Sequence, residues 1–152
     1  RLGVLNPDEL DARFEILNET YVKKLQIEAR ILGDMCLNHV IPAAVKYQNI
    51  LIENIRGMKE IFGEKHVEYC SSEIDTLKKT SGYINSVSND VELLVESRKK
   101  ANGIEDIAER AKVYSREVKG MMEKIRMSVD NLEMLIDDEV WPLPKYRELL
   151  FF

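Results

Sequence analysis

The stretch LGDMCLNHVIPAAVKYQNILIENIRGMKEIFG, residues 32–63, decides how many helices this chain forms. Apolar residues recur in it every three or four positions, as on one face of an α-helix, yet Pro42 lies inside the pattern. A proline within a helix removes one hydrogen bond and crowds the preceding turn, which costs about 3 kcal/mol. The spacing nevertheless continues across residues 40–44, which contain no Gly, Asn or Asp to make a turn. We therefore predict a kink at Pro42; a break there would give four helices instead of three.

The first predicted helix begins at Pro7, with Asn6 as its N-terminal cap, and ends at Gly63. One apolar stripe follows its whole length at helical spacing, which indicates a single long helix with one buried face. The stripe contains Leu10, Phe14, Leu17, Tyr21, Leu25, Ala29, Leu32, Cys36, Val40, Ala44, Tyr47, Leu51, Ile55, Met58 and Phe62.

Two further helices are predicted over residues 66–100 and 104–139, separated by a left-handed cap at Asn102-Gly103. No strand pattern occurs in the sequence. Because the connections are short, neighbouring helices must be antiparallel, and we predict an all-α, up-down bundle of three long helices followed by an apolar C-terminal strap. The predicted inner row of the second helix is Val67, Cys70, Ile74, Leu77, Ser81, Ile84, Ser88, Val91 and Val95.

These helices differ in length, and the difference predicts an uncovered surface. At about 1.5 Å per residue the first helix would extend roughly 80 Å, whereas the others would each span about 50 Å. Counted from the turn at Gly63, the shorter helices reach back to about residue 30. The apolar stripe over residues 7–29 is therefore expected to need a partner outside this chain.

The chain closes with EVWPLPKYRELLFF, residues 139–152, which is far more apolar than the sequence before it. Pro142 and Pro144 favour an extended strap from which Trp141 and Leu143 project, before a short helical turn. We expect this segment to dock elsewhere; the alternative is that it folds back onto its own bundle. The candidate inter-domain or inter-subunit docking residues are Phe14, Leu17, Tyr21, Leu25, Trp141, Leu143, Tyr146, Leu149, Leu150 and Phe151.

Composition argues against nucleic-acid-binding, membrane-spanning and secreted proteins. The 152 residues fit one domain, and the net charge of −5 argues against a nucleic-acid-binding surface. No apolar run reaches the roughly 18 to 20 residues needed to cross a membrane, and the first residues lack the features of a signal peptide. Cys36 and Cys70 are typical of small core residues in a reducing compartment, so we expect a cytoplasmic protein.

Four potential metal ligands occur in two pairs, Cys36 with His39 and His66 with Cys70. In the predicted bundle Cys70 lies roughly 30 Å along the axis from Cys36, so the pairs cannot share an ion. The sequence also lacks a Glu-x-x-His pair for a di-iron site and any glycine-rich phosphate-binding loop. We therefore predict no catalytic, cofactor-binding or metal-binding residue in this chain.

Several blocks of this sequence resemble one protein family. They are the N-H-x-I-P, K-Y-Q-N and L-I-E-N-I-R-G blocks within residues 32–63, SRKKAN at 97–102, and DDEVWPLPKYRELLF at 137–151. Together they resemble the C-terminal helical region of type III glutamine synthetases. The segment over residues 66–96 is similar mainly in pattern.

The resemblance implies that residues 1–152 form one helical domain at the C-terminal end of a much larger enzyme subunit. Members of that family make glutamine from glutamate and ammonia with ATP and Mg²⁺ or Mn²⁺, in homododecamers of two hexameric rings. No catalytic residue of the family falls within these positions, so this part is expected to be inactive and to contact the rest of its subunit and neighbouring subunits. Two alternatives stay open: a stand-alone helical-bundle interaction module, and a helical enzyme with an unrecognised site.

Overall fold

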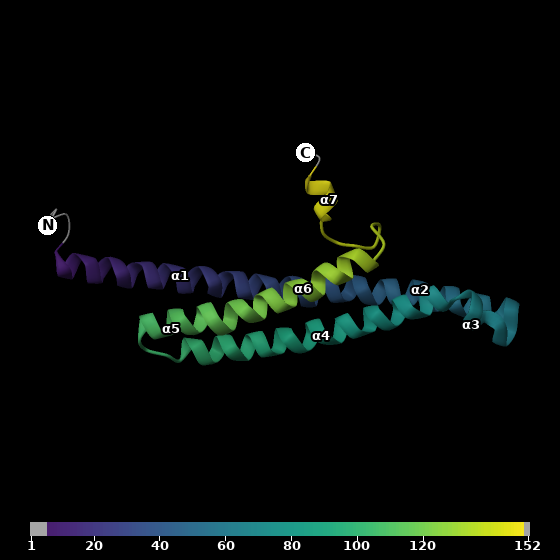
Figure 1. The fold of residues 1–152 in the computed structure, drawn as a ribbon, viewed down its shortest axis with the longest axis horizontal. Coiled ribbons are helices and arrows are strands. Elements are labelled where there is room, and N and C mark those ends of the chain that lie inside the picture. Colours follow the sequence, from purple (N-terminus) through teal and green to yellow (C-terminus); the bar gives the residue numbers. More distant parts are fainter. Residues whose placement is uncertain (1–5, 151–152) are drawn as a thin grey trace.

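The computed structural model describes residues 6–150, except for the side chains at positions 146 and 147. These residues contain helices and no strand, which confirms the all-α prediction, and three long helical segments lie alongside one another (Figure 1). The elements are α1 (Pro7–Met35), a first π-helical turn (Cys36–Val40), α2 (Ile41–Phe62), a 3₁₀ turn (Gly63–Lys65), α3 (His66–Tyr69), α4 (Ser71–Asn102), α5 (Ile107–Val113), a second π-helical turn (Tyr114–Val118), α6 (Lys119–Leu135) and α7 (Tyr146–Leu149).

The first helix passes Pro42 without a break, as predicted. Pro42 is the second residue of α2, directly after the first π turn. The N–H of Ile41 donates to the carbonyl of Cys36, five residues back, so the wider turn closes just before the proline. Such a turn takes up one extra residue while the backbone stays helical. As a result, α1 and α2 form one continuous rod (Figure 1).

The helix ends agree with the predicted caps at two positions and not at a third. Asn6 Oδ1 accepts a 2.8 Å hydrogen bond from the Glu9 N–H, and the Glu9 carboxylate accepts one of 2.9 Å from the Asn6 N–H, which fixes the start of α1. Gly63 ends α2 with φ 59°, a conformation that favours glycine. The left-handed cap expected at Gly103 is wrong, because its φ is −77° and its N–H donates to the Lys100 carbonyl in a tight right-handed turn.

The second predicted helix is interrupted at Cys70, which separates the four-residue α3 from the long α4. Val67 is consequently exposed, contrary to prediction. Within α4 the predicted row includes the buried Val91 but misses a parallel row at positions 80, 87, 94 and 101, all of which are buried. This row was missed because it begins with Thr80 and ends with Ala101, which give a weak apolar signal.

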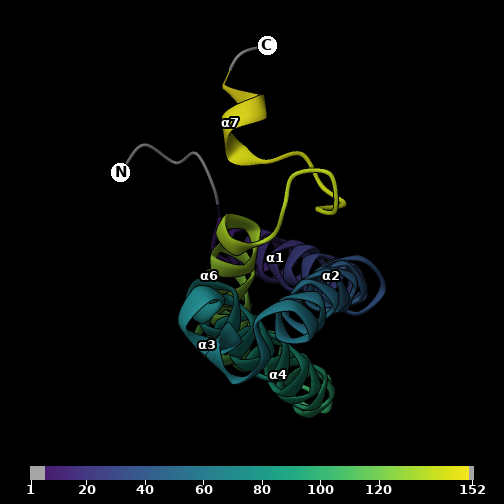
Figure 2. The same cartoon turned by 90° about the vertical axis from the view of Figure 1, so that its right-hand side faces the viewer.

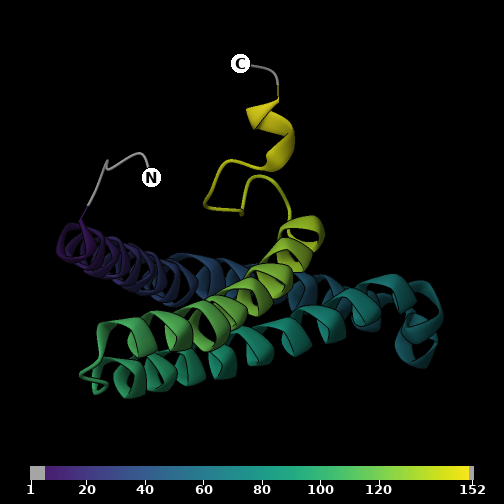
Figure 3. The same ribbon diagram turned by 60° about the vertical axis from the view of Figure 1, so that its left-hand side comes forward.

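The third long segment consists of α5, the second π turn and α6, and it packs against α4 along its length. Helix α6 crosses obliquely over the α1–α2 rod (Figures 1 and 3). The residues that begin and end the two π turns, Cys36 and Val40 in one and Tyr114 and Val118 in the other, are almost fully buried. Both π turns contact α4, and their buried residues belong to the one core cluster.

The bundle covers more of α1 than the length estimate predicted. Val22, Leu25 and Ala29 are buried, so the uncovered part is residues 7–21 and not 7–29. The reason is that α4 continues to Asn102 and the following loop carries the chain farther along α1 before α5 begins at Ile107. We call Pro7–Tyr21 the α1 overhang (Figure 1).

The burial of Cys36 predicts a loss of stability at alkaline pH. Burial raises the pKa of its thiol from 9.0 to about 11. The folded state keeps the thiol proton to a higher pH than the unfolded chain does. The resulting stabilisation is fully present below pH 9, and it disappears as the pH rises toward 11. For Cys36 it amounts to about 2 to 3 kcal/mol at most.

Denaturant unfolding of a Cys36→Ala variant should therefore show a smaller fall in unfolding free energy between pH 7.5 and pH 10.5 than the unmodified chain. Burial also raises the pKa of Cys70 and Tyr114, so part of the fall should persist. Equal falls in both proteins would contradict the role assigned to Cys36.

Candidate docking surface

The α1 overhang is an apolar helix surface without a partner in the described chain. Leu10, Phe14 and Leu17 are between 58% and 67% exposed, and Tyr21 is 37% exposed. These four side chains lie on one face of the helix because their spacing is four, three and four residues. Soluble proteins rarely leave large apolar side chains exposed in one contiguous row, so this surface is suited to contact with another molecule or domain.

Not every residue predicted to dock is accessible. Leu25 is buried within the chain, as is Trp141 at 7% exposure, so the expectation that both would be available for docking is wrong. Both side chains belong to the same core cluster, which Leu143 contacts at its edge. Leu149 and Leu150 are exposed. The side chain of Tyr146 and the whole of Phe151 lie outside the described residues.

The strap after α6 folds back at its start, and Lys145 holds it there. Its ammonium donates 2.7 Å hydrogen bonds to the Ile136 carbonyl, at the end of α6, and to the Asp138 carboxylate. The Lys145 side chain is only 11% exposed, so its bond to the Ile136 carbonyl is shielded from water, whereas the Asp138 carboxylate is 45% exposed. Beyond this point the chain turns outward, and α7 stands away from the bundle (Figures 1 and 2).

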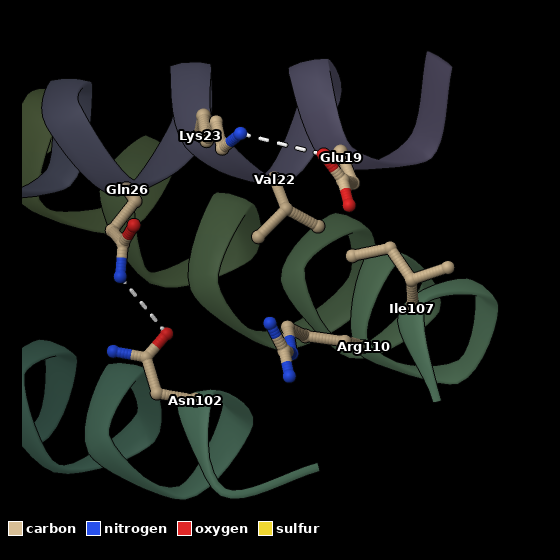
Figure 4. A pocket seen from close by; sticks show the side chains of 7 residues that line it. All are labelled: Glu19, Val22, Lys23, Gln26, Asn102, Ile107 and Arg110. Atoms are coloured by element: carbon tan, nitrogen blue, oxygen red, sulfur yellow. Dashed lines mark hydrogen bonds and ion pairs between the residues drawn. The ribbon is translucent and has the colours of Figure 1, made fainter. Parts of the chain in front are cut away.

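A polar cluster joins the end of the overhang to the turn between α4 and α5 (Figure 4). Asn102 Oδ1 accepts hydrogen bonds from Gln26 on α1, at 3.0 Å, and from the buried Tyr114 hydroxyl, at 2.6 Å. Arg110 donates through Nε and Nη2 to the Ile104 carbonyl within the turn. The cluster therefore fixes the point on α1 at which the bundle stops and the overhang begins.

Next to this cluster is a small cavity of about 160 Å³, lined by residues of α1, α4 and α5 (Figure 4). Lys23 pairs with Glu19 across its edge at 3.4 Å, and both side chains are largely exposed. Gln26 donates to Asn102, and Arg110 donates to the Ile104 carbonyl, so the polar side chains of the lining bind one another or the backbone, and we assign no ligand to the cavity.

A second hollow, of about 380 Å³, forms a groove between α1 and α6. Leu25, Leu32 and Met122 provide its apolar lining. The lining also contains two basic side chains, Lys119 and Arg126, and two acidic ones, Glu28 and Glu123. The lining therefore combines three apolar side chains with a balanced set of charges.

The structure brings together no metal-binding group from the predicted candidates. Among residues 6–150 no three His, Cys, Asp or Glu side chains are close enough to hold a metal ion. In the same range no helix is both long and apolar enough to cross a membrane.

Comparison with known proteins identifies the family. Residues 1–59 match the model of the glutamine synthetase C-terminal domain. The chain is 46% identical over 149 residues to a glutamine synthetase of Bacteroides fragilis, an alignment that covers 97% of the chain. It belongs to the glutamine synthetase C-terminal domain family.

Two further relatives extend the similarity. A type-3 glutamine synthetase of Dictyostelium discoideum is 30% identical over 98% of the chain, and a glutamine synthetase of Butyrivibrio fibrisolvens is 28% identical over 99%. The chain spans only about a fifth of the length of these three relatives, with 20% or 21% of each covered. The resemblance stated from the sequence is confirmed.

One buried charge of this glutamine synthetase domain was missed by the sequence analysis. Asp90, on α4, is 3% exposed, and its Oδ1 accepts a 2.7 Å hydrogen bond from Lys124 on α6. The other carboxylate oxygen has no hydrogen-bond partner within the described residues. Spacing could have found Asp90, because it lies three residues after Val87 and four before Leu94, but the predicted inner row of this helix did not include these positions.

The attachment of the strap can be tested through Trp141, which is the only tryptophan. A Lys145→Met variant should lose about 1 to 3 kcal/mol of stability, mainly because the shielded charge-assisted hydrogen bond to the Ile136 carbonyl is removed. Its tryptophan emission should shift to the red as the indole becomes exposed.

A Lys78→Met variant is the matched control, since Lys78 forms an exposed pair with Asp75 at 3.5 Å. It should change stability by no more than about 0.5 kcal/mol and leave the emission unchanged. Identical emission spectra for the two variants would show that Lys145 does not hold the strap.

Proposed function

We propose that this chain is the non-catalytic helical domain of a type III glutamine synthetase and supports assembly of the enzyme. The observation that carries the proposal is the combination of exposed apolar surfaces, on the overhang and at Leu149 and Leu150, with relatives about five times as long as the chain. Apolar surfaces of this kind are expected to be covered in the complete protein.

The whole enzyme would make glutamine from glutamate and ammonia while hydrolysing ATP to ADP and phosphate. We place the ATP and the Mg²⁺ or Mn²⁺ ions in the remainder of the polypeptide. The proposed partners of this domain are the rest of its own subunit and neighbouring subunits, in a homododecamer of two hexameric rings. Both cysteines are unpaired, which is consistent with a cytoplasmic enzyme.

A stand-alone interaction module is the second candidate, and the core of the bundle favours it. Ile125, Leu132 and Tyr114 are completely buried without help from another chain. Such a core would allow independent folding. The two candidates differ in what happens to the complete enzyme when the exposed apolar surfaces are altered.

The first test concerns catalysis. We expect the purified 152-residue chain to release no ADP above background in a coupled assay with glutamate, ammonia, ATP and Mg²⁺, because its sequence lacks a phosphate-binding loop and clustered metal ligands. The full-length enzyme in the same assay is the positive control. Turnover by the chain alone would overturn the proposal.

The second test concerns assembly. In the full-length enzyme, numbered as here, Leu149→Glu together with Leu150→Glu should lower the assembled fraction by about tenfold or more, because two buried leucines contribute roughly 1.5 to 3 kcal/mol each. Native mass spectrometry measures the oligomers, and the glutamine synthetase assay measures activity.

Met127→Glu is the matched control, because Met127 is equally open to solvent at 68% and lies on α6 away from the tail. We expect normal assembly and activity from it. If the double variant assembles as well as this control, Leu149 and Leu150 have no docking role.

A further inference from the structure

We propose that the start of the strap, residues 137–145, is a latch that releases Trp141 from the core as one unit while the helices stay folded. We call these residues the strap loop. The inference goes beyond the proposed assembly role, because it concerns a movement of the chain and not a contact with another molecule. Three features carry it: the hydrogen bonds of the strap loop, the surroundings of the Trp141 indole, and the two prolines that follow this residue.

The beginning of the strap loop is a turn held by Asp137. Its carbonyl accepts hydrogen bonds from the N–H groups of Val140, at 3.1 Å, and Trp141, at 2.9 Å. Its carboxylate Oδ1 accepts a 2.8 Å bond from the Glu139 N–H. These bonds join residues of the loop to one another, so they persist when the loop moves as a unit.

Lys145 closes the other end of the loop. Its ammonium binds the Asp138 carboxylate within the loop and the Ile136 carbonyl directly before it, both at 2.7 Å. Ile136 is the residue at which α6 ends. The bond from Lys145 therefore joins the two ends of the loop to each other, and it too persists when the loop moves away from the helices.

The strap loop contacts the core of the bundle through apolar side chains. Trp141 belongs to the core cluster, and Val140 and Leu143 are partly buried against that cluster. Release of the loop exposes this one large side chain and two smaller ones, which is far less apolar surface than unfolding of the helices exposes. A segment with so few apolar contacts opens at a lower free energy than the bundle as a whole.

The indole of Trp141 also favours release. The side chain is 7% exposed, and its Nε1 is buried without a hydrogen-bond partner among the described residues. The N–H of a buried tryptophan usually has a partner, and leaving it unpaired is unfavourable. When the latch is open, water binds this N–H. The unpaired donor therefore reduces the free-energy difference between the closed and the open latch.

Two prolines connect the latch to α7. Pro142 and Pro144 each fix the backbone angle φ at about −65°, which stiffens the chain after Trp141. Helix α7 stands away from the bundle (Figures 1 and 2). Release of Trp141 therefore moves α7, and a surface that holds α7 in one place shifts the latch in turn, because such coupling is reciprocal. This last step rests on the docking role proposed above for α7.

Hydrogen exchange of the Trp141 indole in the 152-residue chain tests the latch. Trp141 is the only tryptophan, so its indole N–H gives a single NMR signal. This N–H should exchange at least about a hundredfold faster than the slowest backbone amides of α4 and α6, because only the latch has to open. Its rate should depend little on urea, since little surface is exposed. Exchange as slow as that of the slowest amides, with the same urea dependence, would overturn the proposal.

Two leucine variants distinguish opening of the latch from unfolding of the bundle. Leu143→Ala should speed indole exchange by about tenfold, because it removes part of the apolar contact of the closed latch, and it should leave the slowest amides unchanged. Leu149→Ala is the matched control: Leu149 is 59% exposed on α7, and its loss should change neither rate in this chain. Equal acceleration of the indole and the slowest amides by Leu143→Ala would show that the strap loop opens only with the bundle.

The outcome for the latch is independent of the assembly test. Local exchange of the indole, together with normal assembly of the full-length enzyme carrying Leu149→Glu and Leu150→Glu, would support the latch and contradict the docking role of α7. Exchange of the indole only by unfolding, together with loss of assembly in that double variant, would contradict the latch and support the docking role.

Discussion

Helical continuity through Pro42 is the constraint on which the rest of the structure depends. The first π turn closes its backbone hydrogen bond from Ile41 to Cys36 immediately before the proline, so the missing N–H does not end the helix. Had the chain reversed here, α1 would have been as short as its neighbours. Because it does not reverse, α1 and α2 together are longer than the segments that return along them, and an overhang is unavoidable.

The second π turn packs against α4, as the first does, and this shared support explains how two irregular helices still form one core. Tyr114 and Val118 occupy the ends of one turn as Cys36 and Val40 occupy the ends of the other, and all four are buried. Tyr114 then uses its hydroxyl to bind Asn102, which is also held by Gln26 of α1. The core and the boundary of the overhang are thus connected through a single side chain.

Polar groups fix positions that apolar packing alone would leave open. Burying the Asp90 carboxylate is unfavourable unless it is paired, so its bond to Lys124 opposes sliding of α4 against α6. Lys145 acts similarly at the other end of α6, where it satisfies the Ile136 carbonyl and positions the strap. These two bonds set how α6 lies against α4 and where the strap leaves the bundle.

The sequence by itself determined the all-α class, the continuous first helix, the cap at Asn6 and the end at Gly63, because these depend on local spacing and backbone preference. It also indicated the family, through blocks such as those around Pro42 and Trp141. Tertiary structure alone decided which apolar residues are covered. Leu25 and Trp141 carry the same local signal as Leu17 and Leu149, yet the first two are buried by segments distant in sequence and the last two are not. The extent of α4, the right-handed turn at Gly103 and the inner position of Asp90 were also set by packing between helices, since burial is a property of the neighbours that a residue meets and not of the residue itself.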